Sequence, residues 1–99
     1  MLDPRDLAAR KVLAVLDRAE GRDFTDLWVL AREHGRAETI TWAEQLDSGV
    51  TAGQIAAAFD QLDRIHDDDL PCRRSDRPAV RIRFARWSEQ LRSTSNRTP

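Results

Sequence analysis

The chain has 99 residues, a mass of 11.3 kDa and a formal net charge of −1, with 40% hydrophobic and 33% charged residues. This length suits one small domain, and the balanced charge with ample apolar content excludes intrinsic disorder. No apolar run approaches the roughly 18 residues of a membrane span, and the first residues do not begin a signal peptide. A single cysteine, Cys72, excludes an internal disulfide framework and a cysteine zinc cluster. We therefore expect a soluble, cytoplasmic domain.

Basic residues are unusual in both type and position. The chain contains fifteen arginines, thirteen alanines and one lysine, Lys11, a composition typical of a GC-rich bacterial genome. The lone lysine is thus a candidate for chemistry that arginine cannot supply. Residues 1–72 hold eight basic and fifteen acidic side chains (−7), whereas residues 73–99 hold eight and two (+6). The basic C-terminal quarter is expected to dock either onto phosphates or onto the acidic part of its own fold.

Two helices are predicted at the N-terminus. Asp3 is expected to cap the first, with Pro4 at the first helical position, where its missing N–H costs nothing. Gly21 is expected to end it as a left-handed residue. The second begins near Asp23 and ends at Gly35. Since the connection between them is so short, these helices are predicted to form an antiparallel hairpin.

Two further helices follow. Apolar spacing predicts a third helix over residues 39–47, capped by Thr39 or Thr41. Thr51 is expected to cap a fourth, whose apolar stripe reaches Ile65. Residues 67–78 are predicted to form a loop because they contain an acidic triplet and two prolines.

The apolar residues after Pro78 fit either an alternating strand or a helix. We predict a helix over 80–91, because a lone strand in a helical chain has nothing to pair with. The prediction is therefore all-α: one compact five-helix domain over residues 1–92 that opens with a helical hairpin, followed by a disordered tail over 93–99.

Polar side chains of the first hairpin share faces with apolar ones. On a helical wheel, Lys11 and Arg18 lie with Leu7 in one stripe about 60° wide, at the border of the buried side. They either extend their charged ends to solvent along the apolar surface or face a groove. On the next helix Asp23 falls within the apolar arc and Asp26 at its edge. These two acids fit an N-cap and its capping box, or ion pairs with the first helix.

The helical rise suggests which of these charges can meet. Arg18 lies near the turn and can pair directly with Asp23 or Asp26. Lys11 is offset along the helix axis by about 8 Å from Asp26, too far for a close pair unless the helices cross markedly. We therefore expect a cation and an acid facing one groove across a gap, an arrangement suited to a phosphate-bearing ligand.

These residues form a recognisable pattern. A lysine at 11, alanine at 14 and arginine at 18, followed by Arg22-Asp23-x-x-Asp26-Leu27, resembles the C-terminal half of the AbiEii/AbiGii nucleotidyltransferase toxin family, with the best match over residues 3–35. The resemblance implies a polymerase-β-like nucleotidyltransferase half followed by a helical half. It also implies a toxin–antitoxin system in which nucleotides pass from an NTP, with Mg as cofactor, onto tRNA in some members.

The resemblance assigns roles to five residues. Lys11 would contact the triphosphate, and Asp26 would act near the attacking hydroxyl. Arg18 would orient the acids, Asp23 would cap or support, and Arg22 belongs to the same substrate-binding or supporting set. A lysine is a compact point charge suited to phosphate.

The family's Gly-Ser turn and metal-binding Asp-x-Asp should lie N-terminal to residue 1. Asp67-Asp68-Asp69 matches Asp-x-Asp formally, but it follows the other motifs instead of preceding them. We therefore assign no metal ligand, expect no cofactor to bind this chain alone, and expect it to be inactive alone. Expected partners are the missing half or a second copy, and an antitoxin. RNA is expected to bind only to the complete enzyme, and no membrane is expected. The alternative hypothesis is a non-enzymatic interaction or dimerisation module.

Other patterns carry weaker signals. A helix-turn-helix over Leu30–Leu46 lacks basic residues in its recognition segment. His34 and His66 have no partner ligands nearby, and Cys72 lacks a base. Tryptophans at 28, 42 and 87 are expected to anchor the core or an interface.

Overall fold

The computed structural model describes residues 3–95, which form helices and turns without a strand. The five α-helices are α1 (Pro4–Asp17), α2 (Gly21–His34), α3 (Arg36–Leu46), α4 (Ala52–Asp60) and α5 (Arg77–Ser95). Three short 3₁₀ turns lie between the last two helices: η1 (Gln61–Arg64), η2 (Asp67–Asp69) and η3 (Arg74–Asp76). The all-α, five-helix prediction is confirmed.

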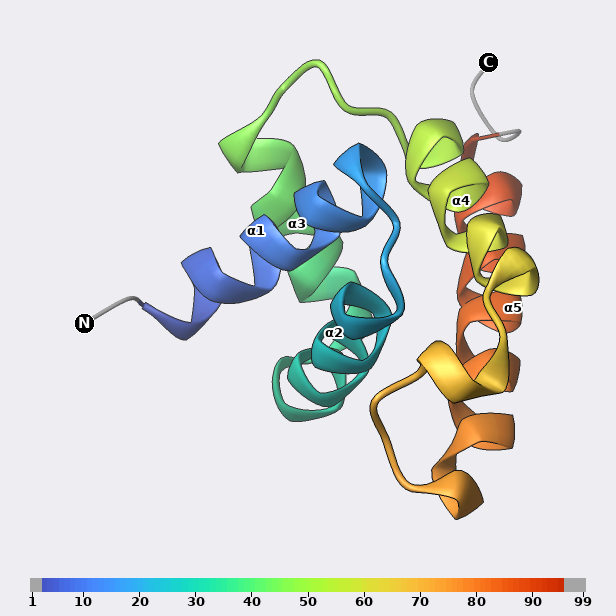
Figure 1. Ribbon diagram of the computed structural model, residues 1–99. Helices are drawn as coiled ribbons and strands as arrows, with labels where there is room; N and C mark the ends of the chain where they lie inside the picture. Colours follow the sequence, from blue (N-terminus) through green and yellow to red (C-terminus); the bar gives the residue numbers. More distant parts are fainter. Residues whose placement is uncertain (1–2, 96–99) are drawn as a thin grey trace.

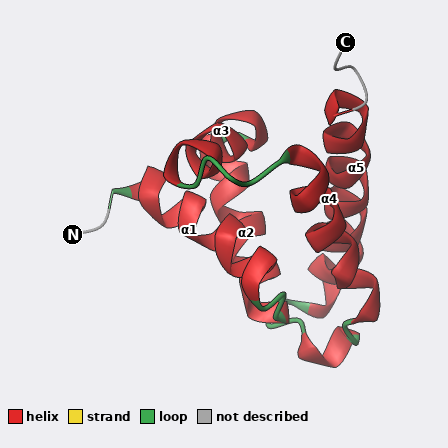
Figure 2. Cartoon of the chain, turned by 90° about the horizontal axis from the view of Figure 1, so that it is seen from above, coloured by secondary structure: helices red, strands yellow, loops and turns green. Residues whose placement is uncertain are grey.

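The helices fall into two groups. α1 packs most extensively on α3 and α2, whereas α4 packs on α5. Figures 1 and 2 show α4 and α5 side by side, with the first three helices gathered beside them. No helix within residues 3–95 combines the length and apolar character needed to cross a membrane.

An aromatic cluster joins the two groups. Phe24 of α2 meets Phe84 of α5 edge-on, with ring centroids 5.2 Å apart. Phe59 of α4 lies 5.0 Å from Phe84 and 4.8 Å from Trp87. Such pairs add to the stabilisation that apolar burial already supplies. Trp28 and Trp87 are buried and Trp42 packs against the core, so the tryptophans are core anchors as predicted.

Local capping explains where several helices begin. The Asp3 carboxylate accepts a hydrogen bond from the Arg5 N–H at 2.9 Å, and Pro4 is the first residue of α1, as predicted. Thr51 caps α4 in a complete capping box: its hydroxyl accepts from the Gln54 N–H, while the Gln54 side chain accepts from the Thr51 N–H. The residues next to each of these two helix starts are therefore sufficient to predict it.

The predicted role of Gly21 is wrong. α1 ends at Asp17, and Ala19, with φ +48°, adopts the left-handed conformation after it. Gly21 instead begins α2, where a Cβ atom would overlap the carbonyl oxygen of Asp69. A glycine is needed here because another part of the backbone passes so close.

Several boundaries also differ from prediction. Gly35, with φ +93°, ends α2 as expected, but α3 starts at the next residue and Thr39 lies inside it, donating its hydroxyl to the Gly35 carbonyl at 2.7 Å. The predicted loop 67–78 contains two 3₁₀ turns, and Pro78 lies in the first turn of α5, where proline is tolerated. α5 continues to Ser95, three residues into the predicted tail; residues 96–99 lie outside the described part.

The basic C-terminal quarter docks in part onto the molecule's own acids. Arg81 donates to Asp67 at 2.8 Å and to the carbonyl oxygens of Leu62 and Ile65. Arg92 pairs with Asp60 of the neighbouring helix. These contacts fix α5 against α4 and against the segment between the two helices.

Candidate functional site

A buried carboxylate lies at the start of α2. The side chain of Asp23 has no exposed surface, and its two oxygens accept hydrogen bonds from Nε and Nη2 of Arg18, each at 2.8 Å. Arg18 follows the last residue of α1, so the short connection places cation and acid opposite each other. The bidentate pair satisfies a charge that would otherwise be costly to bury.

Lys11 bridges this buried acid to a second, accessible one. Its Nζ lies 2.8 Å from Oδ2 of Asp26 and 3.8 Å from Oδ1 of Asp23. The lysine side chain is 21% exposed and that of Asp26 is 44% exposed. Lys11 therefore lies at the edge of the site, between a buried carboxylate and one that solvent can reach.

Two details of the predicted geometry are corrected. The N-cap of α2 is Glu20, without a side-chain hydrogen bond, so Asp23 and Asp26 do not form a capping box. Lys11 and Asp26 also touch directly, without the predicted gap. The offset estimated along the helix axes omitted the reach of the lysine side chain. The predicted pairing of Arg18 with Asp23 is confirmed.

Electrostatics keep the buried acid ionised. The hydrogen bonds from Arg18 lower the pKa of Asp23 below its usual value, against the opposing effect of burial, and the nearby Lys11 acts in the same direction. The same contact raises the pKa of Arg18. Arg18 and Asp23 thus form a fixed pair, in which the half-exposed Arg18 is already engaged by two hydrogen bonds. Lys11 and Asp26 form a second pair beside it, and solvent reaches the Asp26 carboxylate.

Arg22 does not join the group. It is exposed, and within residues 3–95 its side chain makes no ion pair; its carbonyl oxygen accepts the Thr25 hydroxyl at 3.1 Å. The structure therefore brings together four of the five predicted site residues: Lys11, Arg18, Asp23 and Asp26.

The described residues offer no set of three metal-ligating side chains, and this includes the triplet Asp67–Asp69. The residues at the Lys11 group accordingly do not fit a resident magnesium ion: two carboxylates are present, and both already face cations. The chemistry available here is that of a positioned ammonium and an accessible carboxylate.

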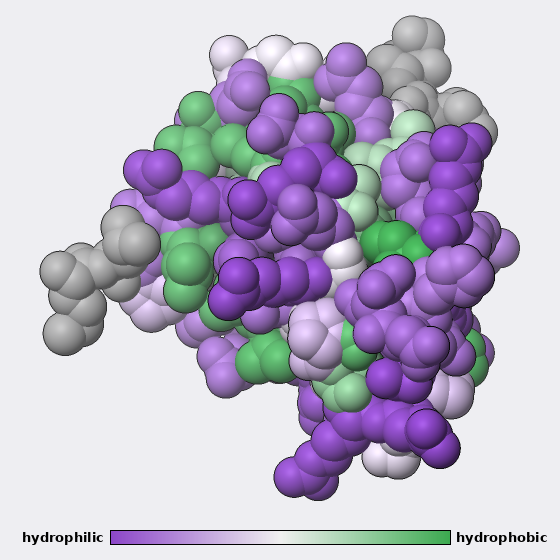
Figure 3. All heavy atoms as spheres, in the orientation of Figure 1, coloured by the Kyte–Doolittle hydropathy of each residue, from purple (hydrophilic) through white to green (hydrophobic). Residues whose placement is uncertain are grey.

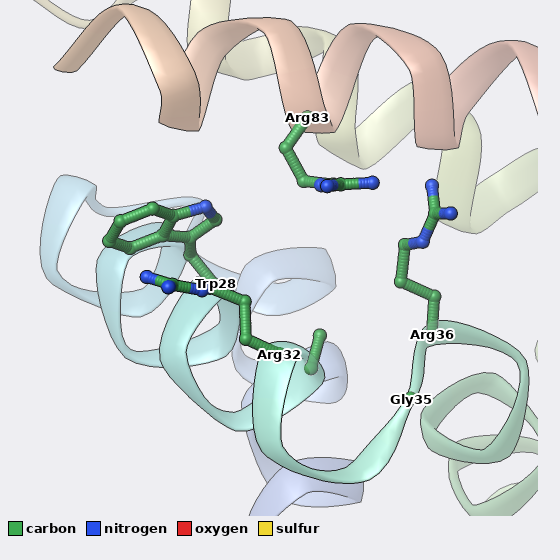
Figure 4. Close-up of a pocket in the computed structure, with 6 residues that line it drawn as sticks. Trp28, Arg32, Gly35, Arg36 and Arg83 are labelled. Atoms are coloured by element: carbon green, nitrogen blue, oxygen red, sulfur yellow. The ribbon is translucent and has the colours of Figure 1, made fainter. Parts of the chain in front are cut away.

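A basic cleft that was not predicted from the sequence lies elsewhere on α2. Trp28, Arg32, Arg36 and Arg83 line a cleft of about 410 Å³ between α2, the start of α3, and α5 (Figure 4). The spacing of Trp28 and Arg32, one helical turn apart, was the available local signal. Arg83 joins them through the tertiary fold alone.

The model of the family described as nucleotidyl transferase AbiEii toxin, type IV toxin–antitoxin system, matches residues 1–93. No curated protein and no solved structure matches the chain.

Proposed function

Because the chain belongs to the AbiEii family of nucleotidyl transferase toxins, we propose that Lys11 and Asp26 are its contribution to a nucleotide-binding active site. The observation that carries this proposal is the accessible Lys11–Asp26 pair beside the fixed Arg18–Asp23 pair. In this arrangement one cation–acid pair is structural and the other is open to exchange.

An incoming phosphate group would compete with Asp26 for the ammonium of Lys11. Lysine suits this exchange because its charge is compact and its side chain flexible. Once Lys11 contacts phosphate, the Asp26 carboxylate is released and can accept a hydrogen bond from a substrate hydroxyl. Asp23, held by Arg18, keeps a negative charge near Lys11 and limits how far the ammonium moves.

Nucleotidyl transfer also requires carboxylates that hold divalent metal. The group around Lys11 does not supply them, so we propose that a Gly-Ser and Asp-x-Asp segment outside these 99 residues is required, and that the chain alone is inactive. NTP with Mg would then act only in the complete enzyme, and so would an RNA acceptor. An antitoxin partner is proposed on the same family basis.

The test is thermal unfolding with millimolar ATP, GTP, CTP or UTP. We expect a small rise in Tm for the parent, because a ligand that binds only the folded state stabilises it. The rise should be smaller in Lys11→Ala than in the parent and unchanged in Arg10→Ala, which removes an exposed cation from the neighbouring position on α1. Equal shifts in the parent and Lys11→Ala, or no shift in either, would contradict the assignment of Lys11.

The alternative function is a protein-interaction or dimerisation module. It is supported by Leu7, which lies one turn before Lys11 on α1 and is 37% exposed. A dimer through the first two helices would cover this side chain. Sedimentation at micromolar concentration tests it: a parent dimer that Leu7→Gln converts to monomer supports the module, and a monomeric parent contradicts it.

A further inference from the structure

The basic cleft described above gathers positive charge from three separate elements. Arg32 comes from α2, Arg36 opens α3, and Arg83 comes from the middle of α5. Figure 4 shows the side chains of Arg36 and Arg83 pointing into the space between α2 and α5, with Arg32 against Trp28. Figure 3 shows hydrophilic side chains covering much of the face seen in Figure 1, around separate hydrophobic patches.

Neutral groups hold two of these guanidinium groups in place. The Arg32 guanidinium lies 4.7 Å from the centroid of the Trp28 ring. Arg36 donates from Nη1 to the side-chain oxygen of Gln90 at 3.2 Å. A cation–π contact and a hydrogen bond to an amide orient the side chains but leave their charge uncompensated.

None of the three arginines forms an ion pair with a carboxylate of residues 3–95, whereas Arg18, Arg81 and Arg92 each do. Three like charges around one cleft repel each other, and an anion bound between them would relieve this repulsion. The cleft, of about 410 Å³, falls in the size range of small-molecule sites, roughly 300–1,000 Å³.

We propose that this cleft binds phosphate groups, supplied either by a free phosphate compound or by the backbone of a nucleic acid. A phosphate offers several acceptor oxygens and up to two negative charges, which suits three guanidinium groups better than a single carboxylate does. The aliphatic lining is limited to Ala31, and Trp28 is already buried, so an acidic peptide would find little apolar anchorage.

The site is distinct from the group around Lys11. At 100° per residue, Trp28 and Arg32 project from roughly the opposite side of α2 to Asp23 and Asp26. The cleft is therefore a second site, independent of the proposed nucleotide-binding group. Lys11→Ala should leave phosphate binding at the cleft unchanged, so the two proposals can fail separately.

The experiment compares two double variants with the same change in charge. Arg36→Gln/Arg83→Gln removes two cleft cations, and Arg64→Gln/Arg86→Gln removes two exposed cations elsewhere. The parent and both variants are titrated with inorganic pyrophosphate, and binding is followed by thermal shift. They are also titrated with a labelled single-stranded RNA of twelve nucleotides, and binding is followed by fluorescence anisotropy. Circular dichroism confirms that both variants remain helical.

We expect the cleft variant to weaken binding of at least one probe by about tenfold or more, since each lost contact is a charge-assisted hydrogen bond. Loss for pyrophosphate alone identifies a free phosphate compound as the ligand. Loss for RNA, with the slope of log K against log salt reduced by about one to two units, identifies a nucleic-acid backbone. Both results support a phosphate site.

The proposal is overturned if neither probe binds the parent, or if the two double variants bind with the same affinity. It is also overturned if polyglutamate binds the parent as tightly as RNA and loses affinity equally in the cleft variant, since the cleft would then select negative charge in general.

Discussion

Asp23→Asn is the substitution that most directly tests the charge arrangement in the first two helices. It preserves the shape of a fully buried side chain while removing its charge. The asparagine oxygen can still accept a hydrogen bond from Arg18, but its NH₂ group would face the cations of Arg18 and Lys11. A buried donor would thus lack an acceptor.

The expected cost follows from two opposing effects. The native carboxylate accepts two charge-assisted hydrogen bonds at 2.8 Å, each worth roughly 1.5–3 kcal/mol. Arg18, however, is 50% exposed, so its released guanidinium regains water and offsets much of that loss. We expect Asp23→Asn to reduce the free energy of unfolding by about 1–2 kcal/mol at pH 7, or Tm by about 5–15 °C.

The pH dependence separates this charge effect from simple loss of packing. Because the pKa of Asp23 is lowered on folding, its charge stabilises the fold fully above the unfolded pKa of about 3.9. That contribution is lost as pH falls through the lower folded pKa. The Tm difference between parent and Asp23→Asn should therefore be largest at neutral pH and shrink below about pH 4.

Scanning calorimetry from pH 7 to pH 3 checks both parts, with the exposed Asp68→Asn as the control. Asp60 is also held ionised, mainly by Arg92, but this contact is shared by all three proteins and cancels in the comparison. A difference under about 2 °C at pH 7 would refute the assigned ion pair. A difference that persists undiminished at pH 3 would assign the effect to packing.

The remaining predictions concern single positions. Gly21→Ala should lower the midpoint of urea unfolding, because the added Cβ would overlap the Asp69 carbonyl. This is the opposite of the usual effect, in which alanine favours a helix over glycine by up to about 1 kcal/mol. An unchanged or higher midpoint would contradict the close approach. Thr51→Ala should cost about 1 kcal/mol in the same assay through the lost cap, and a cost near zero would contradict the capping box. Lys11→Ala should change stability by no more than about 1 kcal/mol, since its close partner Asp26 is accessible to water; a larger loss would make the lysine a structural residue.

The sequence predicted the features that depend on neighbours along the chain. Asp3 with Pro4, the Thr51 cap and Gly35 each lie within a few residues of the helix end that they specify. The choice of a helix for the last segment also succeeded: Val80 and Phe84 repeat at helical spacing and both are buried.

Features that depend on distant parts of the chain were missed. A glycine after an amphipathic stretch usually indicates a helix end, and Gly21 was interpreted in this way. The structure instead requires glycine at this position because the Asp69 carbonyl, which only the tertiary fold brings near, leaves no room for a Cβ atom. The site prediction named four polar side chains that the structure brings together on α1, α2 and the turn between them, but it also included Arg22 and omitted the reach of Lys11. The basic cleft could not be predicted because no local pattern indicates that Arg83 of α5 lies beside α2.

The two sides of α2 have different roles because its sequence places acidic residues on one side of the apolar core stripe and a basic residue on the other. Asp23 and Asp26 face α1, and their charges are matched there by Arg18 and Lys11. Arg32, on the other side, meets an aromatic ring instead of an acid. Since neutralised charges contribute to stability while uncompensated ones attract ligands, substitutions at the Arg18–Asp23 pair should alter folding most. Substitutions at Arg32 should mainly alter binding. The Lys11–Asp26 pair lies between these cases, because it is closed in the free protein yet accessible to a competing anion.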